Sequence, residues 1–134
     1  MSKFVLRSET PTEELEWGKL TWLSRPPATD SKQLTSIDVE LAPGNGHAFH
    51  KHPDQEEMIV CVSGTVEQWI GEEKRILGPG DAVFLYPDVV HATYNDSDEP
   101  ARLLVTLGPC VGEEGYELVD VADQEPWKSL RPSE

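Results

Sequence analysis

The sequence has little cysteine and no long hydrophobic run. Its two cysteines, Cys61 and Cys110, lie far apart and form no CxxC pair, which excludes a disulfide framework and favours a reducing compartment. No apolar stretch approaches the roughly 18 residues that a membrane helix needs, and residues 1–9 lack the apolar segment of a secretory signal. We therefore expect a cytoplasmic protein that does not enter a membrane.

Basic residues are also few. Eleven Lys and Arg residues are outnumbered by 25 Asp and Glu residues, and the formal net charge is −14. Nucleic acids and anionic membrane surfaces are bound through basic faces, so this charge balance argues against both as partners. A small molecule is the partner that we expect.

Clean helical periodicity is missing as well. The 134 residues suffice for one domain, 1–134, and 11 prolines and 10 glycines divide them into short segments. Apolar or alternating runs predict strands at 17–23, 34–41, 57–62, 66–70, 75–77, 82–86, 91–94 and 101–107. Strands this short and closely spaced predict an all-β sandwich or barrel. We expect a short helix over 10–15 in an N-terminal extension, and a C-terminal tail, 112–134, packed across the barrel.

Three of the four histidines lie where they suit metal binding. His50 and His52 are two residues apart on a predicted strand edge, so their side chains point to the same face. Glu57 follows a short loop and comes within reach of His52, and His91 begins a later strand. Three imidazoles and a carboxylate suit one divalent ion of Fe, Mn, Zn, Ni or Cu, with positions left open for a substrate, water or O2.

Two neighbouring residues are alternatives to this set. Glu56 competes with Glu57, but strand alternation favours Glu57 and leaves Glu56 facing solvent. His47 lies in a glycine-rich turn, where we expect it to be exposed. Neutral imidazoles and an ionised Glu57 would leave about one positive charge on a divalent ion, which favours an anionic or enolisable ligand.

These residues fall within two spaced motifs, Gly44-x5-His50-x-His52-x4-Glu57-x6-Gly64 and Gly80-x10-His91-x3-Asn95. The first resembles the first motif of the cupin superfamily at every spacing. The second resembles the second cupin motif, although the two positions that usually hold proline and glycine hold other residues here. The resemblance covers about residues 34–108 and rests on several spacings in two separate blocks.

The resemblance implies a double-stranded β-helix, or jelly-roll barrel, and one metal ion held by His50, His52, Glu57 and His91. It implies no single reaction, because cupins include dioxygenases, decarboxylases, isomerases, lyases and non-catalytic binding proteins. Our leading hypothesis is a metal-dependent enzyme that acts on a small organic molecule, first as an Fe(II)-type dioxygenase. A non-oxidative isomerase or lyase and a metal or small-ligand binding module are the alternatives. Glu57 is also our candidate catalytic residue, as a base released from the metal.

The sequence also suggests residues for the substrate pocket and for a subunit contact. Gln68 shares a strand face with Val66 and Ile70, while Tyr86 and Tyr94 flank the His91 strand. We take Gln68, Tyr86 and Tyr94 as pocket residues. An outward Trp22 on the 17–23 strand would bury its ring in a two-fold contact, so we expect a homodimer.

Overall fold

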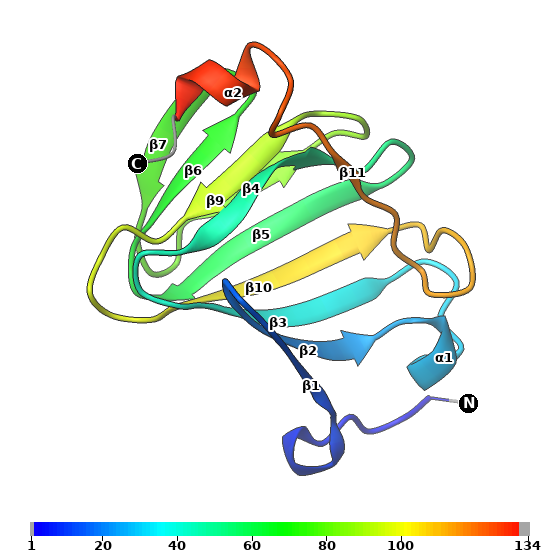
Figure 1. Ribbon diagram of the computed structural model, residues 1–134. Helices are drawn as coiled ribbons and strands as arrows, with labels where there is room; N and C mark the ends of the chain where they lie inside the picture. Colours follow the sequence, from blue (N-terminus) through cyan, green and yellow to red (C-terminus); the bar gives the residue numbers. More distant parts are fainter. Residues whose placement is uncertain (1, 132–134) are drawn as a thin grey trace.

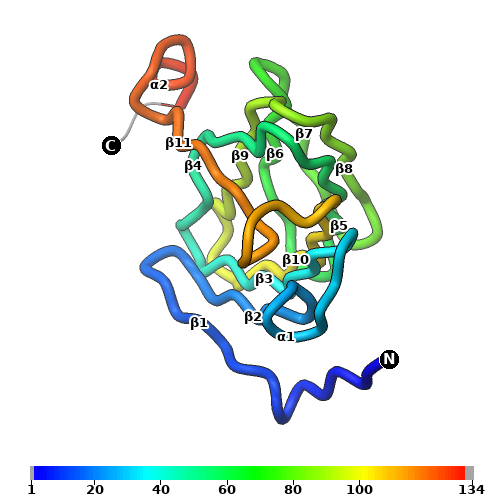
Figure 2. The backbone as a smooth tube through the Cα atoms, turned by 90° about the vertical axis from the view of Figure 1, so that its right-hand side faces the viewer, coloured from blue at the N-terminus to red at the C-terminus, as the bar shows by residue number. Residues whose placement is uncertain are grey.

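The computed structural model describes residues 2–131, which form two antiparallel β-sheets that face each other (Figures 1 and 2). The six-stranded sheet has the order β1 (Thr12–Leu15), β2 (Gly18–Ser24), β3 (Thr35–Leu41), β10 (Ala101–Gly108), β5 (Glu56–Ser63) and β8 (Ala82–Leu85). The five-stranded sheet has the order β11 (Val119–Asp120), β4 (Gly46–Lys51), β9 (His91–Tyr94), β6 (Val66–Ile70) and β7 (Glu73–Leu77). The predicted all-β jelly-roll barrel is confirmed.

Helices contribute little to this fold. They are the 3-10 turn η1 (Arg7–Glu9) and two four-residue helices, α1 (Pro26–Thr29) and α2 (Trp127–Leu130). Within residues 2–131, none of the helices has the length and apolarity that crossing a membrane requires.

The main core lies between the sheets and follows the alternation of the sequence. On β3, Ile37, Val39 and Leu41 are buried, while the residues between them are more exposed. Facing residues of β5 and β10 are buried in the same way, and strand register aligns them: Val105 lies between Ile37 and Ile59. Period-two burial therefore directs one face of each strand into the barrel.

A second apolar cluster covers the outer face of the five-stranded sheet. Phe49, Trp69 and Ala92 are buried there, and the C-terminal tail brings Val121 and Trp127 of α2 against them. Figure 1 shows the tail rising past β11 to place α2 beside β4, β9 and β6. Residues 112–131 of the tail thus pack across the barrel as predicted, while 132–134 lie outside the described residues. Trp69 faces outward but is covered by the protein's own chain.

The N-terminal expectation is wrong. Residues 12–15 form the edge strand β1, not a helix, and pair antiparallel with β2 from Thr12 opposite Thr21 to Leu15 opposite Gly18. The Oγ1 atoms of Thr12 and Thr21 lie 2.9 Å apart, so a cross-strand hydrogen bond supports this register. Pairing with β2 overrides the weak local preference of a segment too short to form a stable helix alone.

The outward placement of Trp22 is also wrong. Its ring lies on the inner side of β2, packs on the main core and contacts Tyr116 edge-on with centroids 5.3 Å apart. The aromatic contact that we used to infer a homodimer is therefore used within the chain. The homodimer itself stays a prediction.

Asn95 closes the loop after β9 with its buried side chain. Its Nδ2 donates to the carbonyls of Leu41 at 3.2 Å and Glu99 at 2.7 Å, and its Oδ1 accepts from the Ser97 backbone N–H and hydroxyl. The residue is fully buried, and these bonds tie the end of β3 to the end of β9. The side chain therefore serves the turn and not the metal centre.

We predict that Asn95→Ala lowers the free energy of unfolding by about 1–3 kcal/mol, because it leaves buried carbonyls without a donor. Asp98→Ala is the matched control, since Asp98 lies exposed in the same loop and such substitutions usually change stability by less than about 0.5 kcal/mol. Urea unfolding of both variants measures the difference. Equal stability would contradict the structural role of Asn95.

Candidate metal centre

Both sheets contribute to the centre. His50 lies on β4 directly opposite His91 on β9, and His52 follows the end of β4. Glu57 lies on β5 in the facing sheet. His50 points inward because its neighbour Phe49 points outward to the second apolar cluster. The strand period therefore brings residues from β4, β5 and β9 to one point inside the barrel.

The four side chains converge closely and are all buried. One ring nitrogen from each of His50, His52 and His91 lies within 4.8 Å of the others. The Oε1 atom of Glu57 is 2.8 Å from Nε2 of His91 and 3.3 Å from Nε2 of His52. Glu56 is exposed, so strand parity selects Glu57 as predicted.

The main chain fixes which nitrogen of each histidine faces the centre. Nδ1 lies 2.6 Å from the Ala48 carbonyl in His50, 2.6 Å from the Glu117 carbonyl in His52 and 3.0 Å from the Val89 carbonyl in His91. A carbonyl only accepts, so each Nδ1 carries the proton and donates it. Each neutral ring then directs the lone pair of Nε2 toward the centre, as the rings of metal-binding histidines do.

The converging atoms lack donors. Nε2 of His52, Nε2 of His91 and Oε1 of Glu57 are fully buried without a hydrogen-bond partner. An unpaired buried acceptor costs about 1–3 kcal/mol, so three at one point call for a shared positive charge. Nitrogen lone pairs and a carboxylate are the donor set that first-row divalent ions take, so the residues fit a metal ion.

The ionisation of the centre agrees with this arrangement. Burial, followed by the charges of His47 and His91, lowers the pKa of His50 well below its ordinary value. Burial alone would raise the pKa of Glu57, but the close contacts of its carboxylate with the rings of His52 and His91 lower it overall. Burial opposes protonation of His52, yet Glu57 raises its pKa. Without a metal, a proton on His52 is thus the positive charge that Glu57 attracts.

A segment of the C-terminal tail completes one wall of the centre. Gln55 is buried and holds this segment: its Nε2 donates to the carbonyls of Pro109 at 2.8 Å and Gly115 at 3.0 Å, and its Oε1 accepts from the N–H of Glu117 at 3.2 Å. Gly115 is required, because its φ is +75° and a Cβ would lie 2.5 Å from Pro26. The segment thereby holds the Glu117 carbonyl against His52.

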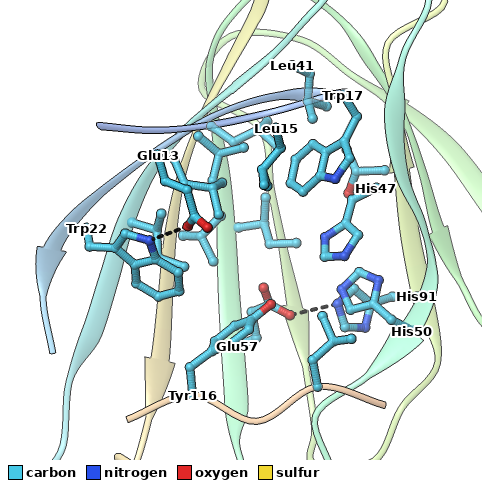
Figure 3. A pocket seen from close by; sticks show the side chains of 18 residues that line it. Glu13, Leu15, Trp17, Trp22, Leu41, His47, His50, Glu57, His91 and Tyr116 are labelled. Atoms are coloured by element: carbon cyan, nitrogen blue, oxygen red, sulfur yellow. Dashed lines mark hydrogen bonds and ion pairs between the residues drawn. The ribbon is translucent and has the colours of Figure 1, made fainter. Parts of the chain in front are cut away.

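A cavity of about 330 Å³ opens beside the four converging residues. Figure 3 shows Glu57, His50 and His91 at one end, with Trp17, Trp22 and Tyr116 around the remaining space. This volume lies in the range of about 300–1,000 Å³ that small-molecule sites occupy. The cavity is therefore the substrate-sized space next to the candidate metal centre.

His47 is not exposed as expected. Its ring stacks on His50 with centroids 3.7 Å apart, and Trp17 stacks on its other face at 4.7 Å. Burial is the main cause that lowers the pKa of His47 to about 4, so this ring is neutral at physiological pH. His47 joins the cavity wall and holds the plane of the His50 ring.

The three residues that we expected in the pocket do not line this cavity. Gln68 is buried deeper and accepts a hydrogen bond from Thr93 Oγ1 at 2.5 Å. Tyr86 follows β8 and is exposed beside Phe84, because both continue the face of that strand that is directed to solvent. Tyr94 lies on the outer face, where it packs on Phe49 and under the Arg131 guanidinium. Strand parity therefore corrects the two tyrosines, whereas Gln68 faces inward as expected but bonds to Thr93 instead of lining the cavity.

The sequence reasoning missed the residues that do form the wall. Glu13 and Trp17 lie at the N-terminal end of the barrel, Trp22 on β2 and Tyr116 in the tail. The isolated tyrosine in a polar tail was the one available signal, since such a residue commonly anchors a segment on a core. Nothing local indicated that β1 turns toward the cavity.

Comparison with known proteins agrees with this architecture. A family model described as "Cupin domain" matches residues 37–107. The pectin degradation protein KdgF of Dickeya dadantii (strain 3937) is 31% identical over 109 residues, which cover 81% of this chain and 94% of that protein. Among solved structures, KdgF from Halomonas sp. aligns with a TM-score of 0.72 at 19% identity, covering 81% of this chain and 94% of the other.

The polyketide cyclase RemF from Streptomyces resistomycificus has the same fold, with a TM-score of 0.75 at 19% identity over 98% of this chain and 95% of the other. The family match spans more than half of the chain and contains all four converging residues. The chain therefore belongs to the cupin domain family.

Proposed function

We propose that this cupin is a metalloenzyme that binds one divalent first-row ion through His50, His52, His91 and Glu57 and acts on a small organic molecule in the adjacent cavity. The observation that carries the proposal is the meeting of buried imidazole and carboxylate acceptors without a donor. The cavity beside them supports a substrate site. The likeness to the pectin degradation protein KdgF supports an enzyme role, and a sugar acid is therefore one of the probes in the substrate test below.

The residues of this site have different roles. The chemistry that a bound divalent ion supplies is Lewis-acid polarisation of a substrate oxygen. Three main-chain carbonyls hold the imidazole rings in the orientation that directs Nε2 inward. Glu57 is the carboxylate at the centre, and we assign it the second role of taking a proton from the substrate.

Tyr116 supplies a second protic group. Figure 3 shows its ring reaching toward Glu57, and both residues line the cavity. Burial and the charge of Glu57 raise the pKa of Tyr116, which keeps the phenol protonated. A protonated phenol beside a carboxylate can donate to the oxygen on which charge develops as Glu57 accepts a proton.

This pair favours proton-transfer chemistry, such as isomerisation or elimination next to a carbonyl, over the dioxygenase that we first expected. Oxygenation requires an open metal position but no acid–base pair in the cavity. A pure binding module requires neither. We therefore propose a non-oxidative reaction and treat oxygenation as the opposing outcome of the test below. The homodimer and the cytoplasmic location stay predictions.

We predict about one equivalent of a first-row divalent metal per chain after purification without chelators. His52→Ala and His91→Ala should each weaken metal affinity by more than about 100-fold, since even partners of a ligand are commonly worth 10–100-fold. His47→Phe keeps the stack on His50 and should retain the metal. Elemental analysis and competition with a chelator give both quantities. A His52/His91 double variant that kept its metal would disprove the ligand set.

A matched pair of variants tests the role of the Glu57 carboxylate. Glu57→Gln should lower metal affinity, because it removes the negative charge at the centre, whereas Glu56→Gln alters an exposed neighbour and should not. Calorimetric titration with Zn(II) compares the two variants. Equal affinity in both would remove Glu57 from the site.

Metal affinity should fall as the pH falls. Glu57 raises the pKa of metal-free His52 above the ordinary value of about 6.5, so protons begin to compete above that pH and win progressively below it. Titration with Zn(II) at about pH 7.5 and about pH 5 measures the loss. Affinity that is unchanged across this range is incompatible with a histidine-based centre.

The reaction class is tested with oxygen. Protein loaded with Fe(II) should convert enolisable ketones and hydroxyketones under anaerobic conditions, and exchange of iron for zinc or nickel should preserve turnover. An oxygen electrode should then record no substrate-dependent uptake. Uptake that tracks product formation and disappears on zinc exchange would establish the dioxygenase instead.

A further inference from the structure

We propose that the cavity takes an uncharged, flat molecule with a conjugated ring and a ketone or hydroxyl oxygen, and that it discriminates against sugar acids. This inference names the substrate class of the proposed metalloenzyme and rests on that function. It is carried by the residues around the cavity and not by those at the metal centre.

One wall of the cavity is a continuous apolar surface. The inward faces of the six-stranded sheet supply it through Ile37, Val39, Leu41, Ile59, Leu103 and Val105. All six side chains are buried in the barrel, so this wall offers no hydrogen bond to a ligand. A hydroxyl pressed against such a surface loses its hydrogen bonds to water without replacement.

Aromatic rings form the sides of the cavity. Figure 3 shows Trp17 over His47 on one side, and Trp22 beside Tyr116 on the other. Trp22 meets Tyr116 edge-on, with an interplanar angle of 80°. Rings on two sides and an aliphatic sheet on a third leave a space suited to a flat apolar body, because aromatic faces gain from stacking beyond the area they bury.

The charge of the cavity wall away from the metal centre disfavours an anionic ligand. No Lys or Arg is among its described lining residues, whereas Glu13 and Glu57 both are. Glu57 lies at the centre, whereas Glu13 lies on an exposed strand where water screens its charge in part. The sign of the Glu13 charge still disfavours a ligand anion beside it. The nearby guanidinium of Arg25 lies over Trp22 and pairs with Glu114 at 3.4 Å, so it is already engaged.

Few polar groups remain for a polyhydroxylated ligand. The Thr93 hydroxyl donates to Gln68, and the Glu13 carboxylate accepts from Trp22 Nε1 at 3.1 Å. The Tyr116 hydroxyl, the His47 ring and the second oxygen of Glu13 are left. Three groups can position the oxygens of a ketone or an enol but cannot satisfy all the hydroxyls around a sugar ring.

The test uses three probes, which distinguish the effect of an aromatic ring on binding from the effect of a charge. The first is a naphthol bearing a neighbouring acetyl group, which is flat and neutral. The second is the same naphthol bearing a carboxylate in place of the acetyl group. The third is galacturonate, a charged sugar. Quenching of tryptophan fluorescence reports binding to the zinc-loaded full chain, and competition with the first probe reports galacturonate.

We expect the neutral naphthol to bind at least about tenfold more tightly than its carboxylate analogue, and galacturonate not to compete. Trp17→Leu and Trp22→Leu should each weaken the neutral probe by about tenfold, the scale of one lost aromatic contact. Trp127→Leu is the control, because Trp127 packs on the far side of β4. The two cavity variants are made separately, so that one still reports if the other fails to fold.

Substitutions of two neighbouring glutamates test the effect of charge at the cavity. Glu13→Gln should improve binding of the carboxylate probe, while Glu14→Gln should not, since Glu14 pairs with Lys19 and does not line the cavity. Preference for galacturonate or for the carboxylate probe would overturn the inference. The same holds for neutral-probe binding that neither tryptophan variant changes.

The same measurements separate this inference from the metal proposal. Zinc stoichiometry is determined on every variant and should remain at the wild-type value. If the protein binds zinc but not the neutral probe, the metal site stands and this inference is wrong. If it binds the probe but no metal, the proposed metalloenzyme is wrong and the cavity assignment stands, because stacking requires no ion.

Discussion

The central constraint in this protein is that three imidazoles donate hydrogen bonds from their N–H groups to main-chain carbonyls. Ala48, Val89 and Glu117 accept those protons, so the three remaining nitrogens face the barrel interior as acceptors, together with the Glu57 carboxylate. Acceptors cannot satisfy one another in an apolar interior. Either a metal ion or a proton must join them, and the tautomers fixed by the backbone make the metal the better match. The arrangement of these acceptors inside the barrel therefore favours a bound cation.

The C-terminal tail contributes to this arrangement of acceptors. The carbonyl that orients His52 belongs to the tail, and Gln55 holds the tail through both its amide atoms. The tail also covers Phe49, whose outward position is the counterpart of the inward position of His50. A strand presents opposite faces at successive residues, so covering one face stabilises the other. The C-terminal segment is consequently part of the site although it lies outside the residues matched by the family model.

The sequence predicted what depends on the two-residue period of a strand. Eight strand positions, the inward direction of His50 and the preference for Glu57 over Glu56 all follow from alternation within one strand. Features that depend on contacts between distant segments were beyond it. Nothing within residues 10–15 shows that β2 is available to pair with them. The helix expected over residues 10–15 fails for this reason, whereas Tyr86 and Tyr94 fail because alternation places them on the outer faces of their strands.

The same division separates the metal centre from substrate selection. The ligands lie on β4, β5 and β9 and on the loop between β4 and β5, where strand register fixes their spacing. The selective wall comes from β1, from Trp17 and Trp22, and from the tail around Tyr116, which lie toward one edge of the six-stranded sheet or outside the sheets. Edge strands and tails can change sequence without disturbing the register of the central strands. One barrel can therefore keep its ion-binding residues while its peripheral segments set which molecule reaches the ion, and here those segments supply aromatic rings and a carboxylate rather than a basic clamp.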